Sequence, residues 1–148
     1  MALRDIIKYG DPILRKTSRP VDKFDDRLFT LLDDMKETLV KAEGVGLAAV
    51  QVGILKRVIV VDCGDGYLEL INPEITETSG TQFETEGCLS IPGQSGTTIR
   101  PAKVKLKAQD RNGKWHVYSA EGLKARCFCH ETDHLNGILY IDKLKPND

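Results

Sequence analysis

The stretch His130-Glu131-Thr132-Asp133-His134 is the feature around which we expect this chain to be organised. On an α-helix, residues four apart lie on one face, about 6 Å apart along the axis. The imidazoles of His130 and His134 can therefore bind one metal ion, and Glu131 beside them can take a proton from metal-bound water. The alternative is a solvated helix with two surface histidines. The chain has three histidines, however, and two of them stand here at ligand spacing.

A catalytic metal site usually has three protein ligands and one open position. The residues after His134 offer only Asp142 and Asp148 as weak candidates. Tyr140 stands where metalloproteases of the H-E-x-x-H-x-x-G-x-x-H type have a third histidine. We therefore expect the third ligand upstream, and Cys88, at the start of a loop, is the best candidate.

Two further cysteines precede the motif on the same predicted helix. Cys127 and His134 are seven residues apart, or roughly 10 Å of helix axis, whereas metal bonds to S and N are only about 2.0–2.3 Å long. One ion therefore cannot join Cys127, His130 and His134 along a straight helix. Cys129 points roughly 100° away from His130. We predict that Cys127 and Cys129 are core cysteines.

Length and composition are those of a soluble globular protein with one domain, residues 1–148. A formal net charge of -1 argues against a nucleic-acid groove. No apolar run reaches the length of a transmembrane helix, and the N-terminus has no signal or transit sequence. We therefore expect a cytoplasmic protein whose four cysteines are thiols.

The apolar pattern predicts an extended arm over residues 1–22 and a helix over about 25–41, capped by Asp25 or Asp26. It predicts strands over 58–61 and 67–71, the second ended by Asn72-Pro73. Further strand-like runs cover about 80–85, 97–99, 104–108 and 115–119, with a hairpin turn at 110–113. His116 is predicted to be an ordinary residue of the last of these strands. The fold class that follows is α+β, with antiparallel strands packed around a central H-E-x-x-H helix and an N-terminal helix.

The segment 44–53 is small, apolar and glycine-rich, and it does not end like a phosphate-binding loop. It is either a buried turn or a loop that lets a ligand backbone approach closely, with Gln51 as its one polar head.

Three stretches together make the chain closely resemble the peptide deformylase family. The family motifs G-Φ-G-Φ-A-A-x-Q, E-G-C-Φ-S and H-E-x-D-H are complete and in order at residues 44–51, 86–90 and 130–134. The likeness covers essentially the whole chain, including its opening at residues 7–15.

The resemblance implies a role for each matching residue. Cys88, His130 and His134 would bind the metal, Glu131 would be the general base, and Gln51 with the backbone N–H of Leu89 would hold the oxyanion. Residues that would bind substrate are Gly44, Val45, Gly46, Leu47, Gly87, Leu123 and Cys127. Of these, Val45, Leu123 and Cys127 would line the pocket for the methionine side chain. Arg100 would be structural, with Asp133 as its acidic partner.

The activity implied is that of a metal-dependent hydrolase, which removes the N-formyl group from the formyl-methionine of newly made peptides and releases formate. The cofactor implied is one divalent ion per chain, with Fe²⁺ favoured and Zn²⁺, Ni²⁺ or Co²⁺ as alternatives. The partners are the N-formylmethionyl peptide and, as an open question, the ribosome. No membrane or nucleic-acid partner is expected.

Two other functions stay open on the sequence alone. A metalloprotease would share the chemistry but cut internal peptide bonds, and the mismatch at Tyr140 counts against it. A structural zinc module would need a fourth ligand, from His116, Cys63 or Cys129.

The chain departs from the family pattern in four respects. Val50 replaces a common proline, Ser95 stands where some members have a substrate-contacting arginine, and Cys129 stands where glutamine is common. The sequence also ends without the long C-terminal helix of some members. None of these departures removes a ligand or the base.

Overall fold

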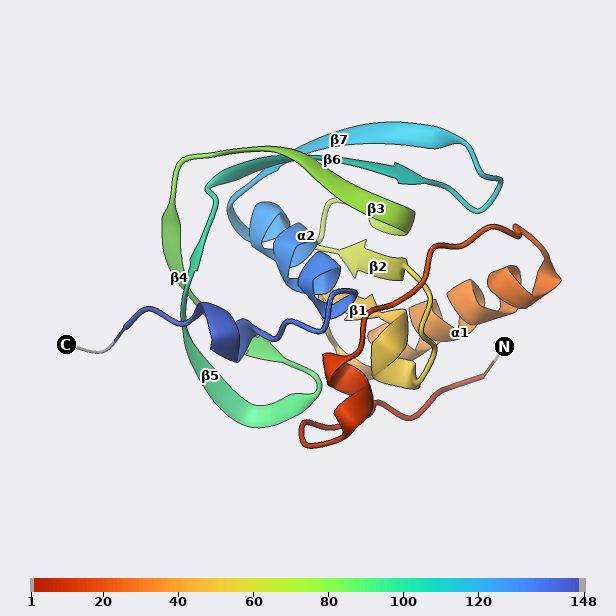
Figure 1. The fold of residues 1–148 in the computed structure, drawn as a ribbon, viewed down its shortest axis with the longest axis horizontal. Coiled ribbons are helices and arrows are strands. Elements are labelled where there is room, and N and C mark those ends of the chain that lie inside the picture. The colour runs from red at the N-terminus through yellow and green to blue at the C-terminus, as the bar shows by residue number, and fades with distance from the viewer. Residues whose placement is uncertain (1, 147–148) are drawn as a thin grey trace.

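Helix α2, Gly122–His134, lies in the middle of the molecule with strands on several sides of it (Figure 1). This computed structural model describes residues 2–146. A five-stranded antiparallel sheet has the order β1-β2-β3-β6-β7, and β4 and β5 form a separate antiparallel pair. The strands are Gly46–Ala48 (β1), Val58–Asp62 (β2), Tyr67–Ser79 (β3), Gln82–Cys88 (β4), Ile91–Arg100 (β5), Lys103–Gln109 (β6) and Trp115–Glu121 (β7). The predicted α+β class is confirmed.

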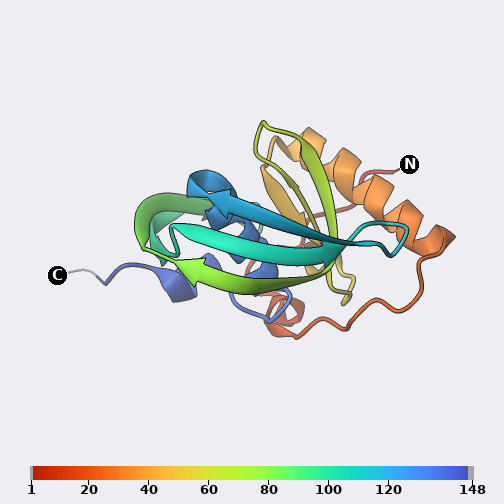
Figure 2. The ribbon, with the colours of Figure 1, turned by 90° about the horizontal axis from the view of Figure 1, so that it is seen from above.

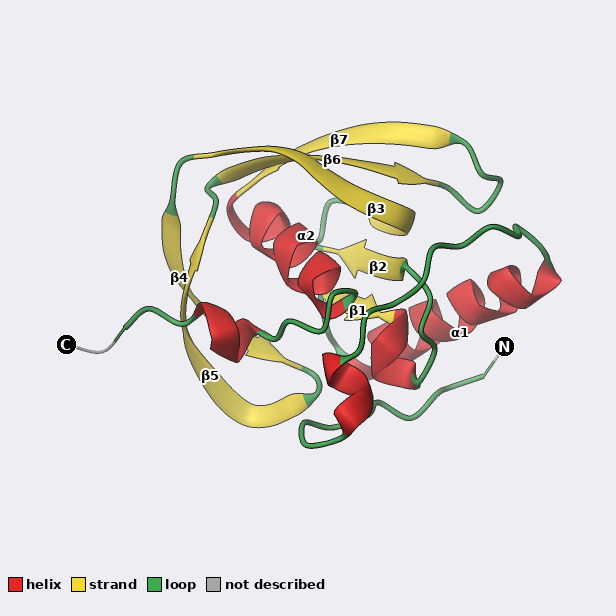
Figure 3. Cartoon of the chain, in the orientation of Figure 1, coloured by secondary structure: helices red, strands yellow, loops and turns green. Residues whose placement is uncertain are grey.

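Strand β2 separates the two main hydrophobic clusters of the protein. Its Ile59 and Val61 pack with Phe128 of α2, whereas Val58 and Val60 pack with residues of helix α1, Asp26–Ala42. Both faces of β2 are therefore buried, which explains a continuous apolar run in place of an alternating one. Figure 3 shows the two helices on opposite sides of this part of the sheet.

Helix α1 matches its prediction to within one residue. Asp25 is the N-cap, and its carboxylate accepts a hydrogen bond from the backbone N–H of Leu28 at 3.2 Å. The chain leaves the helix at Glu43, whose left-handed φ of 56° turns it toward β1.

The prediction that the strand after Tyr67 ends at Asn72-Pro73 is wrong, because β3 continues to Ser79. The pairing with β6 shifts between Ile71 and Glu74, so Pro73 falls in an irregularity where its missing N–H costs no ladder bond. Asn72 takes a left-handed φ of 53° there. Its side-chain amide bonds both the N–H and the C=O of Val21, at 2.8 and 2.9 Å.

Two further segments are more regular than predicted. The arm over residues 2–22 contains a 3₁₀ helix, Pro12–Arg15, capped by Asp11. The glycine-rich segment is neither a simple turn nor a loop, since it forms the edge strand β1 and a 3₁₀ helix, Ala49–Val52. A third 3₁₀ helix, Tyr140–Lys143, follows α2.

The remaining strands lie where the sequence predicts them, but their lengths differ from the predicted ones. β6 and β7 form the predicted hairpin across residues 110–113, and β5 is longer than the three residues predicted for it. His116 lies in β7 as expected, with Nε2 at 2.8 Å from Asp110 Oδ2. Figure 2 shows the long strands β3, β6 and β7 side by side across the molecule. No helix among residues 2–146 is long and apolar enough to cross a membrane.

Candidate metal centre

Three residues from two elements bring ligand atoms together at the end of β4. Cys88 is the last residue of β4, and His130 and His134 lie one turn apart on α2. Their Sγ and ring nitrogen atoms all lie within 4.8 Å of one another. His134 Nε2 is 3.2 Å from His130 Nε2 and 3.4 Å from Cys88 Sγ. These are the three residues that the sequence singled out as ligands.

The three atoms fit a single divalent ion. With bonds of about 2.0–2.3 Å and tetrahedral angles, two nitrogens are about 3.3 Å apart and a sulfur and a nitrogen about 3.6 Å apart. The two distances found here lie within a few tenths of an ångström of these values. Burial lowers the pKa of His130, but the charge of Glu131 and contacts with Cys88 and Glu86 outweigh it and raise that pKa to about 10. The pKa of His134 is shifted the other way, well below its ordinary value, by burial and by the charge of His130.

Glu86 orients His130, and the sequence reasoning gave it no role. His130 Nδ1 is 2.5 Å from Glu86 Oε1, so the outer ring nitrogen is held and Nε2 faces the cluster. Arg100 donates two hydrogen bonds to Glu86, at 2.8 and 3.3 Å, and Thr98 donates one at 2.7 Å. Burial opposes the charge of Glu86, but the hydrogen bond with His130 and those from Arg100 prevail and lower the pKa of Glu86 to about 2.

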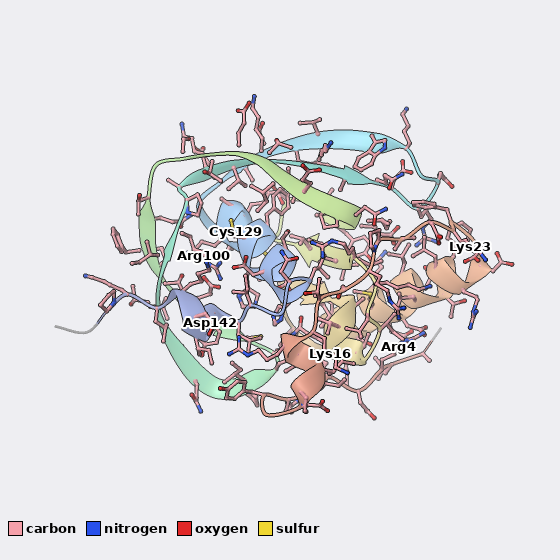
Figure 4. All side chains as sticks on the ribbon, viewed as in Figure 1. Arg4, Lys16, Lys23, Arg100, Cys129 and Asp142 are labelled. Carbon is pink, nitrogen blue, oxygen red and sulfur yellow. The ribbon has the colours of Figure 1, made fainter. Side chains whose placement is uncertain are left out.

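Arg100 joins the β4–β5 pair to α2. It contacts Asp133 at 2.5 Å as well as Glu86, and its side chain is buried. The predicted pairing of Arg100 with Asp133 is confirmed, and Figure 4 shows Arg100 lying between the β5 segment and α2. A signal for Glu86 was present in the sequence: it stands two residues before Cys88, on the same face of one strand.

Gln51 lies next to the cluster with its amide in a fixed orientation. The side chain is buried, and its Oε1 accepts a hydrogen bond from the N–H of Ala48 at 2.9 Å. Nε2 donates to Ser90 Oγ at 3.0 Å and lies 3.7 Å from Cys88 Sγ. The NH₂ group of the Gln51 amide therefore faces Cys88 at the edge of the cluster. Leu89, the other residue expected to supply an oxyanion donor, follows Cys88 in the turn between β4 and β5.

Glu131 is buried beside the cluster and only partly satisfied. Its Oε2 lies 4.0 Å from His130 Nε2, and its buried Oε1 has no hydrogen-bond partner among the described residues. Burial raises the pKa of this carboxyl to about 7. A Cβ on Gly46 would lie 2.6 Å from Oε2 and 2.9 Å from Cys127 Sγ. The missing side chain of Gly46 thus leaves the space that the Glu131 carboxylate needs, whether or not a substrate is bound.

A pocket of about 360 Å³ opens onto these groups. Its walls contain most of the residues that the sequence assigned to the site, together with four that it did not. They are Glu43, Gly44, Val45, Gly46, Gln51, Thr85, Glu86, Gly87, Cys88, Leu89, Leu123, Arg126, Cys127, His130 and Glu131. Leu47 and His134 are buried, and Leu47 packs into the α1 side of the core.

The other candidate ligands lie outside this cluster. Cys127 and Cys129 are buried in the core as predicted, and burial raises the pKa of Cys129 to about 11. Cys127 Sγ contacts the carbonyl of Val45 at 3.5 Å. Asp142 pairs with Arg15. Within residues 2–146, the group of ligand atoms around His130 contains three residues and no fourth.

The sequence matches one protein family over nearly its whole length. A family model described as Polypeptide deformylase matches residues 3–148. The chain is 59% identical over 148 residues to Peptide deformylase 1 of Clostridium acetobutylicum, covering 100% of this chain and 99% of that protein. It is 57% identical over 144 residues to a peptide deformylase of Caldicellulosiruptor bescii, covering 97% and 87%.

The fold also closely matches solved structures of peptide deformylases. The crystal structure of peptide deformylase from Thermotoga maritima superposes with a TM-score of 0.95 at 45% identity, covering 97% of this chain and 99% of that one. A Synechococcus elongatus peptide deformylase in complex with actinonin gives 0.93 at 42% identity, covering 97% and 79%. Sequence and structure agree with the resemblance drawn from the three motifs. The chain therefore belongs to the polypeptide deformylase family.

Proposed function

We infer that this chain is a metal-dependent hydrolase that removes the N-formyl group from the N-terminal formyl-methionine of newly made peptides and releases formate. The observation that supports it best is the convergence of three groups on one pocket: the Cys88–His130–His134 cluster, the carboxylate of Glu131 and the amide of Gln51. We propose that residues 1–148 form one catalytic domain for this reaction.

Cys88, His130 and His134 would hold one divalent ion. A set of one thiolate and two imidazoles suits Fe²⁺, Zn²⁺, Ni²⁺ or Co²⁺, and we favour Fe²⁺ because of the family. When bound, the ion would supply Lewis acidity that polarises the formyl carbonyl and acidifies a water molecule. Glu86 keeps His130 oriented for this role through the contact at Nδ1.

Glu131 carries the protons of the reaction. Its unpartnered Oε1 is available to accept a proton from the attacking water and to deliver it to the departing amine nitrogen. Such general acid–base catalysis typically contributes about 10²–10⁴-fold. Of the two other carboxylates in the pocket wall, Glu86 is committed to Arg100, Thr98 and His130, and Glu43 is an exposed residue at the end of α1.

Gln51 and the backbone N–H of Leu89 would stabilise the negative charge that develops on the formyl oxygen. The Ala48 N–H holds the oxygen end of the Gln51 amide, so the NH₂ end is aimed at the cluster before substrate arrives. One such donor typically contributes about 10²–10³-fold.

The substrate would lie between two strand edges. β1 is an edge strand of the main sheet, so the segment Gly44–Leu47, with Gly87 opposite it in β4, can bond an extended peptide backbone. Val45 and Leu123 are apolar yet 43% and 45% exposed, and Cys127 lines the same pocket. A methionine side chain would bury this surface.

The two rival functions are each opposed by an observation. Tyr140 is buried and stacks beside His130, with ring centroids 6.2 Å apart, and supplies no metalloprotease ligand. A structural zinc site needs four protein ligands, whereas the described cluster has three. We further propose that the enzyme acts in the cytoplasm on chains emerging from the ribosome, because its substrate is the N-terminus of a newly made peptide.

The test is release of formate by anaerobically prepared, metal-loaded protein. Formyl-Met-Ala-Ser should be hydrolysed at its formyl group, while Met-Ala-Ser and an internal peptide bond should stay intact. Cys88→Ser should fold normally and lose most metal and most activity, because a hydroxyl replaces the anionic ligand. Peptide-bond cleavage would indicate a protease, and a metal-loaded protein inert toward all substrates would indicate a structural site.

A further inference from the structure

Arg126 lies on the same face of α2 as the metal ligands. Residues 126, 130 and 134 are spaced by four, so they form one stripe along the helix. Arg126 is one turn, or about 6 Å of axis, before His130 and toward the helix N-terminus. It lines the pocket together with Leu123 and Cys127. Arg126 therefore lies in the pocket wall on the side of His130 that faces the start of α2.

Arg126 is a half-buried residue whose guanidinium has no partner among residues 2–146. Residues 2–146 contain five arginines that are buried or half-buried, and the other four all bond acceptors. Arg4 pairs with Asp34, Arg57 bonds two carbonyls, Arg100 pairs with Glu86 and Asp133, and Arg111 pairs with Glu69 and Asp33. Arg126 has no hydrogen bond or ion pair to any described residue. The pocket wall thus contains a guanidinium whose five N–H donors have no acceptor among the described residues.

The distance between Arg126 and the cluster determines which residues of a bound peptide Arg126 could contact. A peptide whose formyl group lies at the cluster extends away from it by about 3.3–3.6 Å per residue. The 6 Å offset between His130 and Arg126 corresponds to about two residues of such a peptide. Counted from the formyl group, these two residues are the methionine and the one after it, and the length of the arginine side chain extends its reach to the next residue. An acidic side chain that meets Arg126 would therefore belong to one of the first two residues after the methionine. Carboxylates match the planar fork of a guanidinium in a bidentate arrangement.

We propose that Arg126 is a specificity-determining residue, which selects substrates with an aspartate or glutamate at one of the two positions after the formyl-methionine. The proposal rests on the deformylase function inferred above, and it names a preference within that substrate class. Glu43, which is exposed and has no ion pair among the described residues, lines the same pocket from the end of α1. Its negative charge would disfavour a substrate carboxylate there, so we expect the acidic side chain to bind on the α2 side of the pocket.

The test compares peptides that differ by one charge at constant shape. Formyl-Met-Glu-Ala-amide and formyl-Met-Ala-Glu-amide are assayed against their Gln counterparts with the metal-loaded enzyme. We expect a preference for Glu of about fivefold in kcat/KM at one of the two positions, expressed mainly in KM, as for a partly exposed ion pair. The preference should shrink as the salt concentration rises.

Variants at Arg126 test whether this residue causes the preference for Glu peptides. Arg126→Gln should abolish the discrimination between Glu and Gln peptides, and Arg126→Lys should retain part of it. Lys124→Gln is the matched control: it removes one positive charge from the same helix, but Lys124 pairs with Asp65 outside the pocket. This variant should keep the full preference.

Two results would overturn the proposal. One is a wild-type enzyme that does not discriminate between the Glu and Gln peptides. The other is an Arg126→Gln variant that loses kcat/KM equally for all four peptides, since a backbone contact or a structural role would act on them alike. Calorimetric binding of the unformylated Met-Glu-Ala and Met-Gln-Ala amides tests the same preference without turnover. It separates a failure at Arg126 from a failure of the deformylase function, which would appear as loss of formate release from every peptide.

Discussion

Glu131 owes its position to the absence of a side chain across the pocket. Gly46 in β1 leaves the space that the Glu131 carboxylate fills, and Cys127 closes the same space from α2. The glycine-rich motif therefore shapes the site from within, and its small residues are needed even before substrate binds.

Replacing Glu131 by Gln should keep the metal and the bound peptide but remove most turnover. Gln has nearly the same shape and can still hydrogen-bond water, yet it cannot accept the proton. The barrier should rise by about 3–5 kcal/mol, a loss of about 10²–10⁴-fold. Deformylation rate and metal content are measured on the same sample, with the exposed Glu84→Gln in β4 as control. Loss of metal would make Glu131 a support of the ligand set, and normal turnover would remove it from the mechanism.

Gly46→Ala should inactivate the enzyme more than it destabilises the fold. The new Cβ would meet Glu131 Oε2 at 2.6 Å and Cγ at 2.8 Å, so the carboxylate must move. We expect a loss of at least about 10²-fold in kcat and of about 1–3 kcal/mol in unfolding free energy. Gly44→Ala, whose Cβ would meet only the ends of two leucine side chains at 2.9 and 3.0 Å, should cost less in both measurements. Equal activity losses in the two variants would contradict this account.

At the scale of elements, α2 is fixed at its end by a glycine that contacts the N-terminal arm. Gly137 follows the helix with a φ of 73°, and its carbonyl accepts a hydrogen bond from Arg15 at 3.2 Å. The arm thus packs directly against the turn after His134. The position of the helix that carries His130 and His134 therefore depends on a segment more than a hundred residues away in sequence.

Gly137→Ala should destabilise the protein strongly. A Cβ there would overlap the backbone carbonyl of Arg15, and the left-handed φ would add strain. We expect a loss of about 2–4 kcal/mol, measured by urea unfolding. Gly113→Ala is the control, because its φ of 83° imposes the same strain while its Cβ would meet only Phe24 at 3.7 Å. It should cost about 1–2 kcal/mol, and a Gly137 variant no less stable than this control would show that the carbonyl contact does not matter.

At the scale of the whole molecule, the N-terminal arm crosses three parts of the fold. Arg4 binds Asp34 of α1, Ile7 N–H bonds the carbonyl of Gln51 at 2.7 Å, and Tyr9 N–H bonds the carbonyl of Ser90 at 2.7 Å. Figure 4 shows Arg4 beside α1. The arm therefore holds together the segments that carry the proposed oxyanion donor, Gln51, and the proposed cysteine ligand, Cys88.

Asp34→Asn should loosen this arm in a pH-dependent way. Burial opposes the charge of Asp34, but bonds from Ala2 N–H and Arg4 prevail and lower its pKa from 3.8. Its contribution to stability is therefore complete above about pH 4 and is lost as the pH falls through the lowered pKa. In urea unfolding, the free energy of unfolding of the metal-free wild type should exceed that of the variant by about 1–3 kcal/mol at pH 7. The difference between the two should shrink toward pH 3.

The control for this prediction is Asp65→Asn, which removes a carboxylate whose side chain is 59% exposed. Urea unfolding of this variant should differ little from wild type at any pH, because exposed ion pairs contribute little. A difference between Asp34→Asn and wild type that does not change with pH would show that its carboxylate is not the source.

The sequence determined the parts of this protein that depend on local spacing and residue chemistry. The four-residue interval of His130 and His134 and the rarity of histidine pointed to these two residues as candidate ligands. Helix geometry excluded Cys127 from the cluster that the structure shows. The family motifs pointed to Gln51 and Glu131, and helical periodicity found α1. These features need no knowledge of distant contacts, because the physical constraint acts within one turn or one motif.

Only the tertiary structure decided how distant side chains satisfy one another. That Glu86 holds His130, that Asn72 lets β3 pass Pro73, and that Arg126 is left without a partner all depend on which segments pack together. A buried polar group must find its hydrogen bond wherever the fold supplies one, so its partner cannot be inferred from its neighbours in the chain. The same reason makes Gly46 a requirement of Glu131, more than eighty residues away.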